Sequence, residues 1–94
     1  MRYRGRSWLT DRRTKLLDEL RQNPKDVSPQ RLRTVLRGFG FELVRQSGSH
    51  MMFEHRDGRA LVVPYRRPHV RAVYVRQVIR LLEAAGPQEG VRPS

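Results

Sequence analysis

The spacing of apolar residues predicts two amphipathic helices, one in the first half of the chain and one near its end. Within residues 28–40, and again within 71–85, apolar side chains recur at i, i+3, i+4 and i+7, as on one face of a helix. Ser28 followed by proline is a helix start, and the glycines that follow each segment are helix stops. Each helix therefore offers one face to a core. The apolar positions are Leu32, Val35, Leu36 and Phe39 in the first helix, and Val75, Val78, Ile79 and Leu82 in the second.

Between these helices, three short segments have the pattern of antiparallel strands. The first alternates, with Phe41, Leu43 and Arg45 expected on one side of the sheet and the residues between them on the other. Asp57-Gly58 is a hairpin signal between the second strand and the third. Pro64 ends the third strand or lies on a sheet edge, where its missing N–H is not needed. The predicted strands are residues 41–46, 50–55 and 60–64.

A further helix is expected upstream, from about Asp11 to Arg21, with Thr10 as its N-cap. Its stripe of leucines is narrow and must pack against another element. Together the elements predict an α+β fold of order α-β-β-β-α, with a three-stranded antiparallel sheet, helices on one face and this extra N-terminal helix. The expected boundaries are 1–27 for a basic tail and the extra helix, 28–86 for the main domain, and 87–94 for a polar tail.

Positive charge is the strongest feature of the composition. The 94 residues include 20 Lys and Arg against 9 Asp and Glu, a formal net charge of +11, and all the basic residues except Lys15 and Lys25 are Arg. Such a surface attracts polyanions, and arginine makes bidentate phosphate contacts, which favours a nucleic acid as partner. An arginine-biased genome would explain the ratio of Arg to Lys but not the excess of positive charge.

Other classes of partner and site fit less well. The chain has no Cys, so disulfides and thiolate metal sites are excluded, and the cytoplasm is the expected location. No apolar run approaches the ~20 residues that span a membrane, and the basic N-terminus lacks the apolar segment of a secretory signal. No group of His, Asp and Glu has the spacing of metal ligands, so neither a metal nor a cofactor is expected.

Gly48-Ser49-His50 is the candidate for chemistry. A turn over residues 46–49 leads into the second strand, which places the His50 imidazole at the edge of a small sheet beside a basic surface. RNA carries its own nucleophile, the 2′-OH, so a single general base can start cleavage, and histidine suits that role at neutral pH. The alternative interpretation is that His50 is a surface residue of the strand without a catalytic role. His55, five residues on, points to the opposite face and is expected to be structural or solvent-facing.

Several residues near His50 are candidates for contacting RNA phosphate. Gly48 permits a positive φ and leaves its backbone N–H open to a phosphate, whereas Ser49 is favoured as a turn former, because no base or orienting group is found for a serine nucleophile. His69 is a candidate for binding phosphate or for acting as a second acid. Cations that could stabilise the reacting phosphate, or hold the RNA backbone, complete the set. They are Arg45, Arg66, Arg67, Arg76 and Arg80. Arg76 and Arg80 lie one turn apart on the last helix, and the alternative interpretation is that they only form its solvated face.

Residues 32–85 resemble the HicA-type toxins of bacterial toxin–antitoxin pairs. The matching pieces are Gly40-Phe41-Glu42, Arg45-Gln46-Ser47-Gly48-Ser49-His50, Phe53-Glu54-His55 with Asp57-Gly58, and Val63-Pro64. The resemblance implies a fold like the double-stranded-RNA-binding domain, a metal-independent ribonuclease that cleaves mRNA, His50 as its single catalytic histidine, and a HicB-type antitoxin that silences it. The helix at 11–21 goes beyond the shortest members, and Tyr74-Val75-Arg76-Gln77 replaces the small residue and Leu that often begin the last helix.

Three functions follow from these observations as hypotheses. The first is a toxin that cleaves mRNA with His50 as general base, leaving 2′,3′-cyclic phosphate and 5′-OH ends. Its expected partners are RNA and the antitoxin, and oligomers are expected only through the antitoxin complex. The second is a non-catalytic RNA-binding module of the same fold, which needs the arginine surface but not His50. The third is a DNA-binding protein that uses the last helix, although Gln77 is its only base-reading side chain.

Overall fold

The structure, a computed structural model, describes residues 4–85, with the side chains of residues 13–84. The polar tail predicted at 87–94 and the first residues of the predicted basic tail, 1–3, lie outside the described residues. The elements are α1 (Arg4–Gln22), the short 3-10 helix η1 (Pro24–Asp26), α2 (Pro29–Gly38), β1 (Phe41–Ser47), β2 (His50–His55), β3 (Ala60–Pro64) and α3 (Ala72–Ala85). Their types and order confirm the predicted α+β fold.

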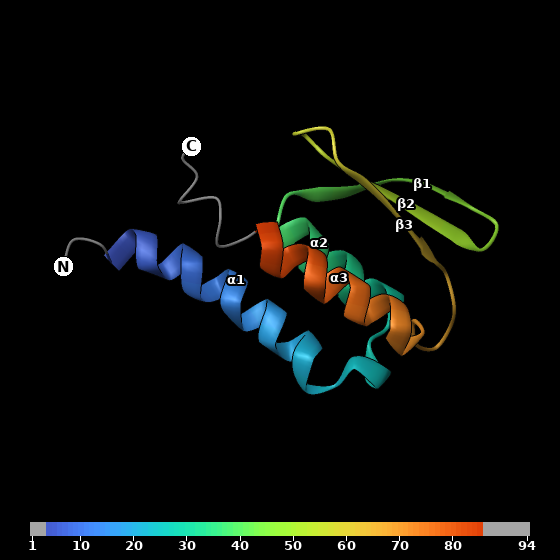
Figure 1. The fold of residues 1–94 in the computed structure, drawn as a ribbon, viewed down its shortest axis with the longest axis horizontal. Coiled ribbons are helices and arrows are strands. Elements are labelled where there is room, and N and C mark those ends of the chain that lie inside the picture. The colour runs from blue at the N-terminus through green and yellow to red at the C-terminus, as the bar shows by residue number, and fades with distance from the viewer. Residues whose placement is uncertain (1–3, 86–94) are drawn as a thin grey trace.

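The fold has three layers (Figure 1). The strands form one antiparallel sheet in the order β1-β2-β3, so β2 is central and the other two strands are edges. Helices α2 and α3 cover one face of this sheet, and α1 packs on the far side of the helix pair (Figure 1). The second face of the sheet is therefore not covered by any described element, and it is accessible to a ligand or a partner.

Helix α2 forms as its sequence signals predict. The hydroxyl oxygen of Ser28 accepts a hydrogen bond from the backbone N–H of Arg31 at 3.0 Å, which caps the helix ahead of a proline in its first turn. Gly40, with a φ of +93°, follows the helix end and turns the chain into β1. The predicted apolar positions of α2 and α3 enter one core, apart from Phe39 and Ile79, which are half-buried beside it. Its fully buried members in these helices are Leu32, Val35, Leu36, Val75, Val78 and Leu82.

Helix α1 is longer than predicted. It begins at Arg4 rather than Asp11, so Thr10 lies inside the helix and is not its N-cap. No proline interrupts residues 4–22, so the helix continues upstream of Asp11 despite Gly5 and Ser7, which are poor helix formers. Leu17 and Leu20 of its apolar stripe are buried in the common core. The predicted packing of this stripe is therefore confirmed, although the predicted start is wrong.

Strand β1 departs from simple alternation. Leu43 pairs with Phe53, but the next pair joins Arg45 to Met52, so Val44 is an extra residue that forms a bulge. A bulge reverses the side to which the following residues point, and Arg45 moves from the predicted side of Phe41 to the open face. The prediction for Arg45 was wrong because a bulge leaves little trace in the pattern: valine fits either face of a strand. Strand β1 then extends to Ser47, so the turn to β2 is shorter than predicted.

All the described buried residues are apolar. The polar and charged side chains of residues 13–84 therefore lie at the surface or partly exposed, and any site must be sought there rather than in the interior. Among the described residues, no helix is long and apolar enough to cross a lipid bilayer.

Candidate functional site

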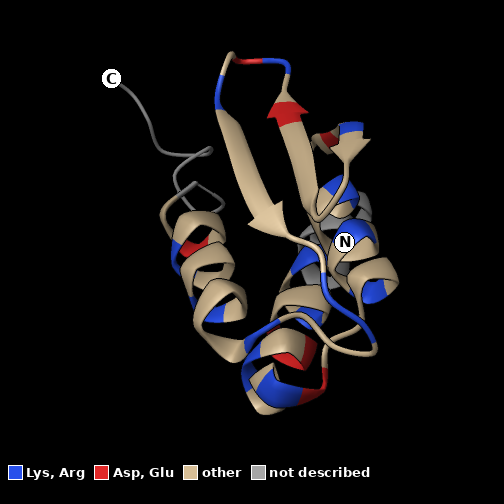
Figure 2. Ribbon diagram, turned by 90° about the vertical axis from the view of Figure 1, so that its right-hand side faces the viewer, with Lys and Arg blue, Asp and Glu red and all other residues tan. Residues whose placement is uncertain are grey.

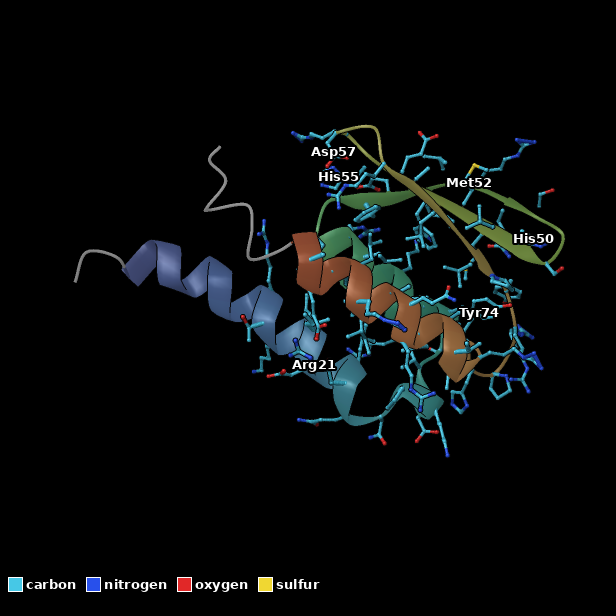
Figure 3. All side chains as sticks on the ribbon, in the orientation of Figure 1. Arg21, His50, Met52, His55, Asp57 and Tyr74 are labelled. Carbon is cyan, nitrogen blue, oxygen red and sulfur yellow. The ribbon has the colours of Figure 1, made fainter. Side chains whose placement is uncertain are left out.

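His50 is the first residue of the central strand. It pairs with Ser47 of β1 and with Pro64 of β3, so it lies where the three strands meet one end of the sheet. Its neighbours Met51 and Phe53 are buried against the helices, and the alternation of the strand therefore turns the exposed imidazole of His50 to the open face. Figure 3 shows His50 at one end of β2 and His55 at the other.

The turn before His50 is tight and is tied to the loop after β3. Ser47 pairs with His50, which leaves only Gly48 and Ser49 between the strands. Gly48 has a φ of +59°, and among the described residues only glycines have a positive φ, a pattern that matches a type II′ hairpin turn. The carbonyl oxygen of Ser49 accepts a hydrogen bond from the backbone N–H of Tyr65 at 2.6 Å. This bond holds the start of the loop with Arg66 and Arg67 beside the turn.

Three arginines belong to the segments that form this end of the sheet, and these segments contain no Asp or Glu. The bulge turns Arg45 to the face of His50, and the exposed Arg66 and Arg67 follow two and three residues after Pro64, which is paired with His50. No Asp or Glu occurs within residues 43–53 or 59–82. Figure 2 shows basic residues in the loop after β3, whereas at the tip of the β2–β3 hairpin an acidic residue lies among the basic ones. An anion is therefore favoured at the His50 end.

The other candidates lie in the loop before α3 and on α3 itself. His69 is half-buried in the loop before α3, next to Val70, whose backbone N–H donates to the carbonyl oxygen of Val27 at 2.8 Å. Arg76 and Arg80 are exposed on α3, and α3 covers the face of the sheet opposite His50 (Figure 1). The structure therefore brings Arg45, Arg66 and Arg67 to the His50 end but places Arg76 and Arg80 in another layer.

His55 occupies a different environment at the other end of β2. Its side chain is 20% exposed, and its ring meets the Phe41 ring edge-on with centroids 4.9 Å apart. The Nδ1 atom of His55 accepts a hydrogen bond from the backbone N–H of Asp57 at 3.0 Å. The backbone N–H of Arg59, and its guanidinium 2.8 Å from the carboxylate, lower the pKa of Asp57. These contacts fit the predicted structural role of His55.

Sequence reasoning missed an apolar patch on the open face of the sheet. Val44 and Val62 are exposed by 50% and 49%, and the half-buried Met52 lies opposite Val62. The alternation of β3 carried a signal for Val62, because Val63 had to face the core. Alternation carried a signal for Val44 as well, because it follows Leu43 on the side opposite Phe41. The patch lies beside the arginines at the His50 end.

Metal ligands do not gather anywhere in the described part of the chain. Across the described residues, no group of three or more His, Cys, Asp or Glu side chains is close enough to hold an ion.

Comparison with known proteins identifies the family. A family model described as the HicA toxin of bacterial toxin–antitoxin matches residues 29–83, which span α2, the whole sheet and all but the last turn of α3. No curated protein matches the chain, and no solved structure does. The match covers more than half of the chain and includes the turn, His50 and the arginines beside it. The chain therefore belongs to the HicA toxin family and is the toxin component of a bacterial toxin–antitoxin system.

Proposed function

We propose that this toxin is an endoribonuclease that cleaves mRNA without a metal ion, with His50 as the general base. The observation that carries the proposal is the position of His50: an exposed imidazole on the open face, at the one end of the sheet where arginines gather without a carboxylate. The family to which the chain belongs supports the same activity. The polyanionic backbone of RNA fits the charge, and its 2′-OH supplies the nucleophile.

The proposed reaction is an internal transesterification. The imidazole of His50 takes the proton of the 2′-OH, and the 2′-oxygen attacks the adjacent phosphorus. The bond from phosphorus to the 5′-oxygen breaks, and this oxygen takes a proton from solvent, which leaves a 2′,3′-cyclic phosphate and a 5′-OH. Arg45, Arg66 and Arg67 hold the phosphate and stabilise the extra negative charge that it acquires. General base catalysis of this kind contributes roughly 10²–10⁴ in rate.

Two features of the turn support the geometry of this reaction. Gly48 presents no side chain, and a Cβ built there meets nothing within 4 Å, so a phosphate can approach the backbone closely. The bond between Ser49 and Tyr65 fixes the distance between the turn and the arginine loop. Gly48 and Ser49 therefore position the site, and His69 is assigned to phosphate contact at its edge.

The same face suits the partner that silences the toxin. We expect a HicB-type antitoxin to cover His50, with apolar groups on Val44, Met52 and Val62 and acidic groups on the surrounding arginines. A buried apolar centre with a charged rim is the usual anatomy of a protein interface, and opposite charges speed association. Oligomers of the toxin would then form through the antitoxin.

The experiment is cleavage of a long single-stranded RNA by the purified toxin in EDTA, beside His50→Ala. Fragments with cyclic phosphate ends from the wild type alone are the expected result. Cleavage by both proteins would remove His50 from its assigned role, and His69→Ala would be the next variant. Binding by both without cleavage would leave a non-catalytic RNA-binding module.

That second function has one observation in its favour. The imidazole of His50 forms no hydrogen bond or ion pair with any described residue, so no group in the described part of the chain orients it. The arginine surface is sufficient for RNA binding without it. Affinity for RNA that is equal in the wild type and His50→Ala, with intact RNA recovered from both, would establish this module.

A further inference from the structure

A pocket of about 380 Å³ lies under the His50 end of the sheet. The N-terminal half of α2 forms one wall, the helix-facing side of the β1–β2 hairpin forms the roof, and the loop after β3 closes the side. Its volume falls within the range of pockets that hold small organic ligands. The residues that carry the argument are Gln30, Arg33, Gln46, Met51, Tyr65 and Arg67.

The lining combines apolar surface, amides and cations, with no carboxylate. Met51 is buried and Tyr65 packs against the core, so both surfaces are held in place. The side chains of Gln30 and Gln46 form no hydrogen bond with a described residue, which leaves their donors and acceptors available to a ligand. Arg33 and Arg67 likewise have no ion pair with a described residue. Aromatic surface, amides and guanidinium groups together suit a nucleobase with its phosphates.

A larger hollow at the opposite end of the sheet lacks this character. It measures about 1120 Å³ and is lined by four arginines, but also by Glu42, Glu54 and Asp57. Arg59 is already paired with Asp57 there. The carboxylates make it a poor site for an anion, so the smaller pocket is the better candidate.

The smaller pocket is next to His50 across the end of the sheet. Gln46 pairs with Met51, and the next pair along the two strands is Ser47 with His50. Tyr65 follows Pro64, the partner of His50 on the other side. Gln46 lies on the helix side of the sheet and His50 on the open side. A strand of RNA that passes around the end of the hairpin therefore meets both.

We propose that this pocket binds one nucleobase of the RNA next to the bond presented to His50. The amides of Gln46 and Gln30 pair with the base edge, Tyr65 supplies the stacking surface, and Arg33 and Arg67 hold the flanking phosphates. This inference rests on the proposed ribonuclease activity, and it makes cleavage selective for the base at a fixed distance from the cut.

The test measures binding first, in the full chain carrying His50→Ala. Four homopolymer RNA oligonucleotides of equal length are titrated at fixed salt into three proteins: this parent, the parent with Gln46→Leu, and the parent with Gln22→Leu. Gln22 is an exposed residue at the end of α1, so it controls for the loss of an amide. Thermal melting of each variant checks that the fold is kept.

The parent is expected to bind one oligonucleotide about tenfold or more tightly than the weakest, as a bidentate base contact allows. Gln46→Leu should reduce that difference to about twofold or less, and Gln22→Leu should keep it. Equal affinities in the parent, or a preference that survives Gln46→Leu, would overturn the proposal.

Sequencing the ends of a cleaved random RNA separates this inference from the proposed activity. A base enriched at a fixed distance from the cut, and lost in Gln46→Leu with His50 intact, is the expected outcome. Base-selective binding without cleavage would keep the pocket and remove the nuclease. Cleavage without base preference would keep the nuclease and remove the pocket.

Discussion

The two histidines of strand β2 lie five residues apart and differ in almost every physical respect. His55 is mostly buried, packs on the ring of Phe41 and accepts a hydrogen bond from Asp57, which in turn binds Arg59. The imidazole of His50 is exposed, forms no hydrogen bond with a described residue, and has arginines as its charged neighbours. The His55 side chain contributes to packing, whereas the His50 side chain has no polar partner among the described residues.

The difference shows how to separate a structural histidine from a functional candidate. The Nδ1 atom of His55 already has a partner within the protein, whereas neither ring nitrogen of His50 has one among the described residues. The exposed imidazole of His50 contributes little to stability, and its position beside arginines makes it the better candidate for contact with an anionic substrate. Four experiments test this contrast.

The largest effect is expected from exchanging the two histidines for alanine in turn. His50→Ala should reduce RNA cleavage by roughly 10²–10⁴ and leave the free energy of unfolding unchanged. His55→Ala should do the reverse, with a loss of roughly 1–3 kcal/mol in stability, because it removes the ring contact and a hydrogen bond. Cleavage assays below the melting temperature and urea unfolding measure the two effects. A stability loss in His50→Ala as large as that in His55→Ala would abolish the contrast.

The glycines at the two ends of β1 should respond differently to alanine. Both have positive φ, so Gly48→Ala is expected to cost only backbone strain, about 1–2 kcal/mol. In Gly40→Ala the new Cβ would also lie 2.6 Å from Nε2 of His55 and displace that ring. The extra cost is about 1 kcal/mol, the value of the packing between the His55 and Phe41 rings. Chemical unfolding of both variants checks this order, and Gly40→Ala in a His55→Ala background should show no such extra cost.

Arginines at the two ends should differ in their effect on RNA binding. Replacing Arg66 and Arg67 by Gln should weaken binding a few-fold and reduce the slope of log K against log salt by about 1 for each phosphate that is no longer neutralised. Replacing Arg37 and Arg56, which line the hollow with the carboxylates, should leave the slope unchanged. Fluorescence anisotropy over a range of salt concentrations measures the slope. Equal changes in the two double variants would mean that RNA does not prefer the His50 end.

The smallest effect concerns the pH dependence of stability at the His55 end. The Arg59 backbone N–H and guanidinium lower the pKa of Asp57 in the folded state. A lowered folded pKa stabilises the protein at neutral pH, and the stabilisation is lost as the pH falls through that value. Asp57→Asn should therefore be slightly less stable than wild type at neutral pH and equal to it in strong acid. A difference that persists in acid, measured by urea unfolding, would assign the effect to something other than ionisation.

Local signals predicted most of the framework. Ser28-Pro29 fixed the start of α2, the strand bounds of β2 and β3 follow from residue types and Asp57-Gly58, and the spacing of Val75, Val78 and Leu82 identified the face of α3. The separation of His50 from His55 onto two faces also followed from the period of a strand. These features depend on neighbours a few residues apart, which the sequence shows directly.

The details that build the site depend on contacts between distant residues. The bulge at Val44 is a property of the pairing between β1 and β2. It places Arg45 on the face of the sheet that carries His50 rather than on the face that carries Phe41. The bond from Tyr65 to Ser49 links positions that the chain separates by a whole hairpin. The sequence by itself determined the elements, the family and the identity of the candidate base. Only the tertiary structure decided which arginines stand beside it and that a pocket opens beneath it, because pairing register and packing are properties of the whole fold.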